Sequence, residues 1–357
     1  MSWERKNIAA MQGYISGEQP DDPSILKLNT NENPYPPAPA IEEMLQRFSS
    51  EVLRKYPPPN ADEFREIAAT LHDVESGNII ATRGGDELLR LMITTFVDPG
   101  EMIGTTQPTY SLYPVLAQIQ NCPITHVPLT ADWKPPESFS DQLNDADVKL
   151  TLLVNPNAPS GVLVEVEQIE QIARSLNGIL LLDEAYVDFA DNSYDAIPLI
   201  EELDNLVILR TLSKAYSLAG LRLGYGIGPE HLIRPMIEKT RDSYNLDWIS
   251  QKIASIALEE QGYANQTWLR VIQERDALRT ELLKLGFLVP NSQTNFLLAT
   301  VPKTHTAESI YVELKQRNIL VRFFDQVGLS DKLRITIGTA EQNHKLITEL
   351  SSILISQ

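Results

Sequence analysis

The sequence predicts an α/β fold, with a large domain built on a mostly parallel sheet covered by helices on both faces, plus a smaller α+β domain. Two observations predict this class. From about residue 62, short and continuously apolar runs alternate with helix-like segments, which is typical of a parallel sheet buried on both faces. After Gly286 the pattern changes to short strands and helices. A chain of 357 residues is long enough for two such domains.

The elements follow in order along the chain. Prolines cluster at residues 34–39 and 57–59, where we expect extended arms or loops because proline fixes its own φ and lacks an amide proton. The apolar runs predict strands at 78–82, 150–154, 179–182 and 206–209. We expect helices at 86–96 and 166–176, and almost continuous helix from 230 to 285. In the smaller domain we expect short strands and helices at 296–299, 307–317, 320–324 and 333–337, and a final helix that ends at about residue 355.

This pattern predicts three segments. Residues 1–50 form an N-terminal arm and a segment that contributes to the small domain. Residues 51–265 form the large domain, and residues 266–357 form the small C-terminal domain with its connecting helix.

Composition narrows the possible functions. The 30 basic and 48 acidic residues give a net charge of −18, which argues against nucleic acid or an anionic membrane as the main partner. The single cysteine, Cys122, cannot form an intrachain disulfide, and the five histidines lack metal-site spacing, so we expect no metal. The N-terminus does not resemble a signal peptide, and no apolar run approaches the roughly 20 residues of a membrane span. The expected location is the cytoplasm.

Chemically useful side chains follow the predicted strands. Ligands of open parallel sheets usually bind beyond the carboxyl ends of the strands. Gly85-Asp86, Asp183, Tyr186 and Ser213-Lys214 stand at such ends. A lysine in a pocket can form a Schiff base with an aldehyde cofactor. Pyridoxal 5′-phosphate then needs an acid beside its ring nitrogen, a donor at its phenolic oxygen and a cradle for its phosphate.

The sequence offers a candidate residue for each of these cofactor-binding roles. Asp183 suits the ring nitrogen, and Tyr186 suits the phenolic oxygen. The amides of Gly85 and Asp86 would open a helix, where unpaired N–H groups and the helix dipole favour an anion. Ser213 and Arg222 would complete the phosphate cradle, one by its hydroxyl and one by its charge.

The chain resembles the fold-type I pyridoxal-phosphate aminotransferases. The resemblance depends on short sequence motifs that occur in the same order and at similar spacing as in the family. Asp183 and Lys214 are 31 residues apart, and Lys214 and Arg222 are 8 residues apart. The matching pieces are LNTNENPY at 28–35, KYP at 55–57, GGDE at 84–87, PTYSLY at 108–113, the turn at 155–161, DEAY at 183–186, Ser213-Lys214 with Arg222, and LRITIGT at 333–339.

The resemblance implies the cofactor roles. Lys214 would be the Schiff-base lysine and later the proton-moving base, Asp183 the partner of the ring nitrogen, and Tyr110 the aromatic that stacks on the ring. Tyr56 would reach the phosphate from the other subunit, so the active unit would be a homodimer to which the N-terminal segment also contributes. In the family, an asparagine of the 155–161 turn binds the phenolic oxygen, but Ala158 stands there in this chain. Asn157 is our candidate substitute.

The resemblance also implies the substrate residues. Arg334 would bind the substrate α-carboxylate, and Arg322 would bind a substrate phosphate, although it could instead be a surface salt-bridge partner. Tyr14 and Asn33 are candidates for closing over the substrate.

Three functions remain open at this stage. The first is amino transfer between glutamate or 2-oxoglutarate and histidinol phosphate or imidazole-acetol phosphate, in histidine biosynthesis. An aromatic amino-acid aminotransferase would keep nearly every cofactor residue, and a phosphothreonine-type decarboxylase would also need a phosphate-binding arginine. A non-enzymatic cofactor-binding module would normally carry a DNA-binding segment, for which the sequence offers no candidate.

Overall fold

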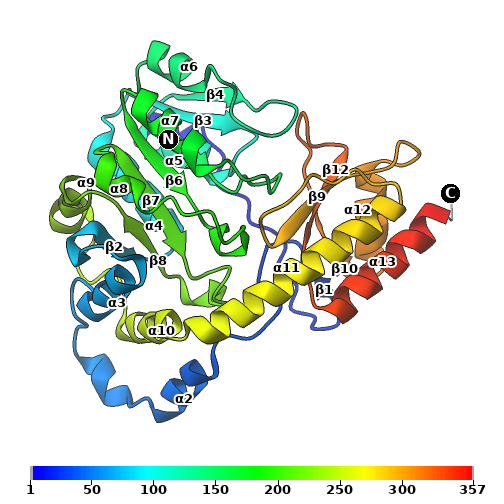
Figure 1. Ribbon diagram of the computed structural model, residues 1–357, viewed down its shortest axis with the longest axis horizontal. Helices are drawn as coiled ribbons and strands as arrows, with labels where there is room; N and C mark the ends of the chain where they lie inside the picture. Colours follow the sequence, from blue (N-terminus) through cyan, green and yellow to red (C-terminus); the bar gives the residue numbers. More distant parts are fainter. Residues whose placement is uncertain (1–2, 356–357) are drawn as a thin grey trace.

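The larger lobe is built on a seven-stranded sheet. The computed structural model describes residues 3–355 and shows this lobe on the left of Figure 1. The sheet order is β2-β8-β7-β6-β5-β3-β4, and β8 runs antiparallel to both of its neighbours while the other pairs are parallel. The strands are β2 (Ile79–Thr82), β3 (Met102–Gln107), β4 (Ile124–Pro128), β5 (Val148–Val154), β6 (Ile179–Asp183), β7 (Leu206–Thr211) and β8 (Gly224–Ile227).

Helices cover both faces of this sheet. Side chains alternate along β6, so Leu181 packs in one buried cluster with Leu88 while Leu180 packs in the other with Ile169. The helices of the lobe are α2 (Pro39–Arg47), α3 (Asp62–His72), α4 (Gly85–Phe96), α5 (Leu112–Gln120), α6 (Phe139–Asp145), α7 (Val166–Ser175), α8 (Leu199–Glu202), α9 (Glu230–Pro235) and α10 (Trp248–Glu259).

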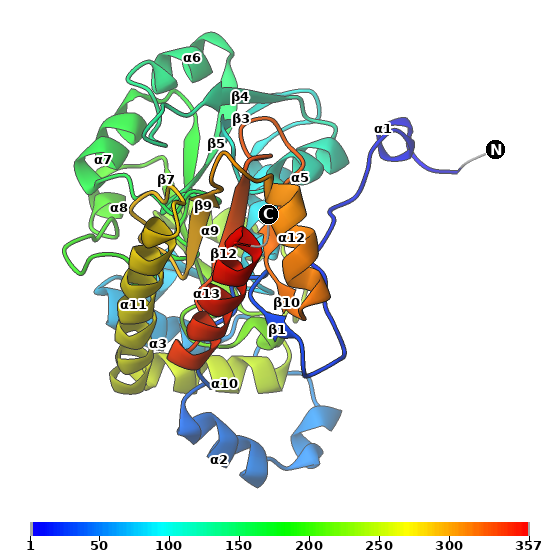
Figure 2. The ribbon, with the colours of Figure 1, turned by 90° about the vertical axis from the view of Figure 1, so that its right-hand side faces the viewer.

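The smaller lobe contains two short sheets backed by helices. Its three-stranded antiparallel sheet has the order β11-β12-β9, and a separate parallel pair joins β1 to β10. Figure 2 shows α12 and α13 on the outer side of these strands. The elements are β1 (Leu26–Lys27), β9 (Phe296–Thr300), β10 (Ile319–Leu320), β11 (Arg322–Phe323), β12 (Lys332–Thr336), α12 (Ala307–Gln316) and α13 (Ala340–Ile355).

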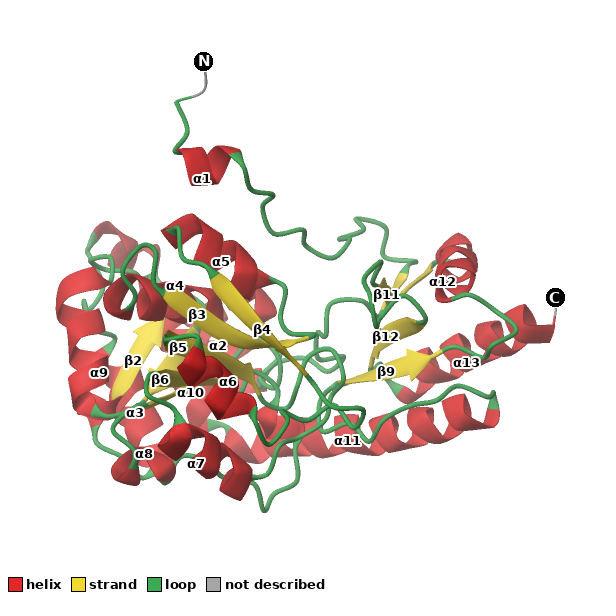
Figure 3. Ribbon diagram, turned by 90° about the horizontal axis from the view of Figure 1, so that it is seen from above, coloured by secondary structure: helices red, strands yellow, loops and turns green. Residues whose placement is uncertain are grey.

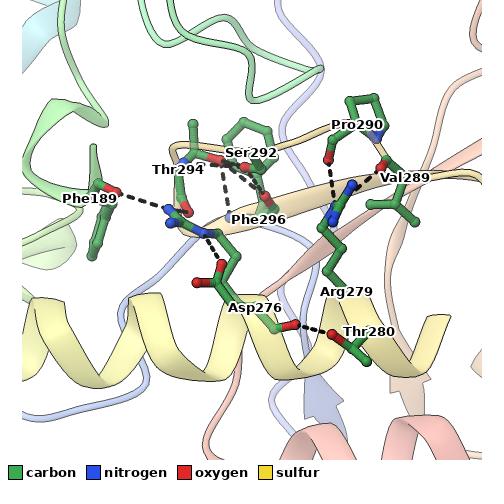
Figure 4. Close-up of polar contacts among 10 residues, drawn as sticks. Phe189, Asp276, Arg279, Thr280, Val289, Pro290, Ser292, Thr294 and Phe296 are labelled. Carbon is green, nitrogen blue, oxygen red and sulfur yellow. Dashed lines mark hydrogen bonds and ion pairs between the residues drawn. The ribbon is translucent and has the colours of Figure 1, made fainter. Parts of the chain in front are cut away.

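The long helix α11 (Gln261–Lys284) connects the two lobes. The guanidinium of Arg275, only 5% exposed, donates to the carbonyls of Phe189 in the larger lobe (2.9 Å) and of Thr294 in the smaller lobe (3.2 Å). Nearby, Arg279 donates to the carbonyls of Val289 and Pro290 (Figure 4). These contacts fix the segment that leads into β9 against the helix.

The N-terminal segment crosses from one lobe to the other. The short helix α1 (Lys6–Ala9) lies beside α5, where Asn7 donates to the Gln118 carbonyl at 2.7 Å. The arm then runs across to the smaller lobe (Figure 3) and enters β1. No helix in the described part of the chain is long and apolar enough to cross a membrane.

The predicted α/β class is confirmed, with two local differences. Three strands of the large sheet, β3, β4 and β8, were not predicted, because MIGTTQ, ITHVP and GYGI contain glycine, proline or polar residues that weaken a strand pattern. The predicted strand at 320–324 is divided after Leu320, and its halves pair in different sheets. The domain boundary that we propose at 265/266 lies near the start of α11.

Candidate active site

A cavity of about 820 Å³ lies between the carboxyl edge of the large sheet and the smaller lobe. Most of the side chains predicted from the sequence line it, although they come from distant parts of the chain. These are Tyr14, Gly85, Asp86, Tyr110, Asp183, Tyr186, Ser213, Lys214, Arg222, Arg322 and Arg334. We therefore take this cavity as the candidate active site.

One end of the cavity is suited to an anion. Arg222 lies 3.3 Å from the Asp86 carboxylate through Nη2 and donates to Ser213 Oγ at 3.4 Å through Nη1. Gly84 precedes α4 with φ of +74°, and a Cβ there would lie 2.9 Å from Arg222 Nη2. The absence of a side chain thus leaves the α4 amides and the guanidinium open to one phosphate-sized group.

Asp183 ends β6 in the floor of the cavity. It is 4% exposed and accepts hydrogen bonds from the Tyr113 hydroxyl at 2.7 Å and the Ala185 amide at 3.1 Å. Burial raises the pKa of this carboxyl to about 6, although both hydrogen bonds act in the opposite direction. A buried carboxylate is costly without a cation, and a protonated ring nitrogen would supply one.

Lys214 follows β7 and points into the same cavity. Its Nζ donates to the Thr30 carbonyl at 3.1 Å and lies 5.9 Å from the centre of the Tyr186 ring. Burial, with Arg334 nearby, lowers the pKa of this amine to about 8. A lysine with this pKa reaches its neutral, nucleophilic form more readily near neutral pH.

Tyrosines line the cavity between these groups. The Tyr186 hydroxyl accepts a hydrogen bond from Asn31 Nδ2 at 3.0 Å. The ring of Tyr110 meets the rings of Tyr14 and Tyr113 edge-on, with centroids 6.1 and 5.6 Å apart. Tyr14 comes from the N-terminal arm, so the arm forms part of the cavity wall.

Two arginines from the smaller lobe face the other end of the cavity. Arg322 on β11 stands opposite Arg334 on β12 in the strand register. Each guanidinium carbon lies 5.6 Å from the centre of the Phe324 ring. Arg334 Nη2 donates to the Asn29 carbonyl at 3.0 Å, but its buried Nε has no hydrogen-bond partner among the described residues. Two adjacent cations can bind a substrate with two anionic groups.

Three predicted residues do not line the cavity. Asn157 Oδ1 accepts from the amide and hydroxyl of Ser160, at 3.2 and 2.7 Å, inside its own turn, and the cavity is lined by Ala158 instead. Asn157 is therefore not placed to replace the missing asparagine. Asn33 donates to the Ala215 carbonyl at 2.9 Å behind the cavity wall. Tyr56 is 81% exposed and stacks on Tyr244.

Two residues that contact the predicted groups were missed. Tyr113 lies in the PTYSLY piece, three residues after Tyr110, and its hydroxyl donates to the Asp183 carboxylate. Asn31 lies in the NTNEN run, where Asn33 was chosen instead. The sequence marks both pieces as important, but only the fold shows that Tyr113 contacts Asp183 and that Asn31, rather than Asn33, faces the cavity.

Residues 23–350 match the family described as aminotransferase class I and II. The chain belongs to this family. It is 44% identical over 351 residues to histidinol-phosphate aminotransferase 1 of Trichormus variabilis, covering 98% of each chain. It is 41% identical over 350 residues to the histidinol-phosphate aminotransferase of Geotalea uraniireducens, covering 98% of this chain and 99% of the relative. The prediction of an aminotransferase of this kind is confirmed.

Solved structures have the same fold. Histidinol-phosphate aminotransferase from Sinorhizobium meliloti, in complex with pyridoxal-5′-phosphate, matches with a TM-score of 0.91 at 22% identity and covers 100% of this chain and 98% of that one. L-threonine-O-3-phosphate decarboxylase from Porphyromonas gingivalis matches with a TM-score of 0.81 at 22% identity, covering 93% of this chain and 100% of that one. Since both reaction types share the fold, the fold alone does not separate them.

Proposed function

We propose that this aminotransferase binds pyridoxal 5′-phosphate in the cavity and moves an amino group between glutamate and imidazole-acetol phosphate, forming histidinol phosphate in histidine biosynthesis. The observation that carries the proposal is the pair of arginines in register, Arg322 and Arg334, which face the same cavity as Lys214. Relatives covering almost the whole chain and named for this reaction support the choice of substrate.

The residues at the large-sheet end would hold the cofactor. The α4 amides at Gly85 and Asp86, with Ser213 and Arg222, would bind the phosphate, and Asp183 would pair with the ring nitrogen. Tyr110 would cover the ring, and Tyr186 would donate to the phenolic oxygen. When bound, the cofactor supplies an aldehyde that links to amines and a ring that accepts electrons.

Lys214 would perform the proton transfer. Its Nζ, with a pKa lowered to about 8, would take the proton from the substrate Cα, hold it as an ammonium and return it to the cofactor's C4′. Arg334 binds the α-carboxylate of glutamate, and Arg322 binds the phosphate of histidinol phosphate. Tyr14 on the arm lies over the bound substrate and helps to exclude water.

The active unit in this proposal is a homodimer in which Tyr56 reaches the phosphate of the partner subunit's cofactor. The exposure of large side chains in the single chain supports the proposed dimer. Tyr56, Leu53 and Tyr244 are 81%, 54% and 42% exposed. A second copy would cover such side chains.

The test is a two-step reaction of the cofactor-loaded enzyme. Histidinol phosphate alone should change the visible absorbance of the bound cofactor, and 2-oxoglutarate should then restore it. Phenylalanine in place of histidinol phosphate tests the aromatic alternative, and stoichiometric release of carbon dioxide from phosphothreonine tests the decarboxylase.

Arg322→Ala sharpens this test. We expect KM for histidinol phosphate to rise about 100-fold, since a charge-assisted pair is lost, while KM for glutamate changes little. Arg317→Ala, which removes a surface arginine paired with Glu349 at 2.7 Å, is the control. Faster turnover of phenylalanine than of histidinol phosphate would overturn the proposed substrate.

A further inference from the structure

Asn31 has a fixed orientation beside the cavity. Its Nδ2 donates to the Tyr186 hydroxyl at 3.0 Å, and its Oδ1 accepts from Thr336 Oγ1 at 3.2 Å. Thr336 Oγ1 also accepts from the Asn31 backbone amide at 2.9 Å, so two hydrogen bonds join these two residues. In this arrangement the carboxamide oxygen of Asn31 faces Thr336, and its NH₂ end faces the Tyr186 hydroxyl.

A tyrosine hydroxyl has only one hydrogen to donate. Because the Tyr186 oxygen accepts from Asn31, its own hydrogen remains available to the cavity that Tyr186 lines. We propose that Asn31 is a positioning residue that directs the Tyr186 hydroxyl to donate to the cofactor's phenolic oxygen, and that this contact compensates for the amide absent at Ala158. The inference rests on the proposed function, since it requires that cofactor.

The backbone around Asn31 supports a dedicated role. Asn31 is 1% exposed, and its carbonyl accepts from Asn295 Nδ2 at 2.9 Å. Its φ is +58°, in the left-handed region that asparagine and aspartate tolerate better than most residues. The contacts come from the N-terminal segment, from the larger lobe through Tyr186, and from the smaller lobe through Thr336. Asn31 thus connects the N-terminal segment to the Tyr186 hydroxyl of the larger lobe and to the Thr336 hydroxyl of the smaller lobe.

Charged side chains in the cavity also influence the ionisation of a cofactor bound beside Tyr186, so the experiment must leave them unchanged. The charged side chains that line the cavity around Tyr186 are Glu32 of the N-terminal segment, Asp86 of α4, Asp183 of β6, Lys214 after β7, Arg222 before β8, Arg322 of β11 and Arg334 of β12. None of them is changed in the experiment below.

The experiment is a pH titration of the visible absorbance of the cofactor bound to the enzyme. A donor to the phenolic oxygen stabilises its ionised form, so loss of the donor should shift the apparent pKa upward. Tyr186→Phe should raise it by about one unit, a tenfold change in the ionisation equilibrium. Asn31→Asp keeps the size and the tolerated φ but offers an acceptor, so Tyr186 should donate to residue 31 instead, and the same shift is expected.

The double variant separates this role from a simple charge effect. If Asn31 acts through Tyr186, then Asn31→Asp in the Tyr186→Phe background adds no further shift. An added shift there would overturn the inference, because it would show an effect of the new charge alone. Asn121→Asp adds the same charge at an exposed residue with a similar φ of +61° and no contact to Tyr186, and it should leave the titration unchanged.

A second substitution at Asn31 keeps the inference testable if Asn31→Asp fails to fold. Asn31→Gly keeps the backbone freedom and adds no charge, and it should give a shift in the same direction of up to one unit. Unchanged titration in both Asn31 variants, with a shift in Tyr186→Phe, would overturn the inference and leave the proposed function intact. Failure of the wild-type protein to bind the cofactor would overturn both.

Discussion

The two ends of the cavity are built differently. At the large-sheet end, Arg222 is bonded to Ser213 and paired with Asp86, and Asp183 is bonded to Tyr113. At the small-lobe end, several buried polar atoms lack a hydrogen-bond partner among the described residues. These are Arg334 Nε, Asn29 Oδ1 and Thr30 Oγ1. At the cofactor end, other protein groups therefore hold the side chains in place before any ligand binds, whereas the buried polar atoms at the substrate end have hydrogen-bonding capacity that a ligand can satisfy.

The largest effect is expected at the lysine that stands between the two ends. Lys214→Ala removes the amine that both binds the cofactor and moves the proton, so kcat should fall on the order of 10⁴-fold. Steady-state and single-turnover rates measure this loss. Lys252→Ala, which removes a surface amine paired with Glu63, is the matched control and should retain full activity. Activity of Lys214→Ala within tenfold of wild type would contradict the role of Lys214.

A smaller effect is expected at the substrate end. Arg334→Lys keeps the charge but loses the planar guanidinium that can grip a carboxylate with two hydrogen bonds. We expect kcat/KM for glutamate to fall about 100-fold, because the remaining charge cannot satisfy both the Asn29 carbonyl and the substrate. Rate measurements over a range of glutamate concentrations test this. Equal losses in Arg334→Lys and Arg317→Lys would show that Arg334 has no special role.

An effect of similar size is expected in the stability of the apoprotein at the cofactor end. The pKa of Asp183 is raised from 3.8 to about 6 in the folded protein, so between these values the native state binds a proton that the unfolded state has released. Stability therefore falls as pH rises through this window, by up to about 3 kcal/mol. Asp183→Asn cannot titrate.

Urea unfolding of both apoproteins at pH 4 and pH 7 gives the comparison. The stability of Asp183→Asn relative to wild type should increase from pH 4 to pH 7, because only wild type carries the buried charge at pH 7. A difference that does not change with pH would show that Asp183 has an ordinary pKa.

Part of the cofactor end could be predicted from the sequence for a physical reason. Asp183, Ser213 and Lys214 follow apolar strands whose carboxyl ends must meet at one edge of a parallel sheet, so their convergence follows from the fold class. Strand β2 and helix α4 were placed within one residue of their observed bounds.

The parts of the site that could not be predicted depend on the directions in which side chains point. In the 155–161 turn, neighbouring side chains point to different sides, and only the folded turn shows that Asn157 faces Ser160. Asn31 and Asn33 are equivalent in the sequence, yet the first faces the cavity and the second donates to Ala215. A pattern of residue types does not settle such orientations, because the contacts that decide them come from distant segments.

The most direct test of the central claim compares Arg222→Lys with Arg334→Lys in two measurements, the Kd of the cofactor and the KM of glutamate at saturating cofactor. Arg222→Lys should raise the Kd about tenfold and leave KM within about twofold, since Arg222 belongs to the cofactor end. Arg334→Lys should leave the Kd within about twofold and raise KM about 100-fold. If each variant weakened both cofactor and glutamate binding equally, the two ends would act as one site, and our account would be wrong.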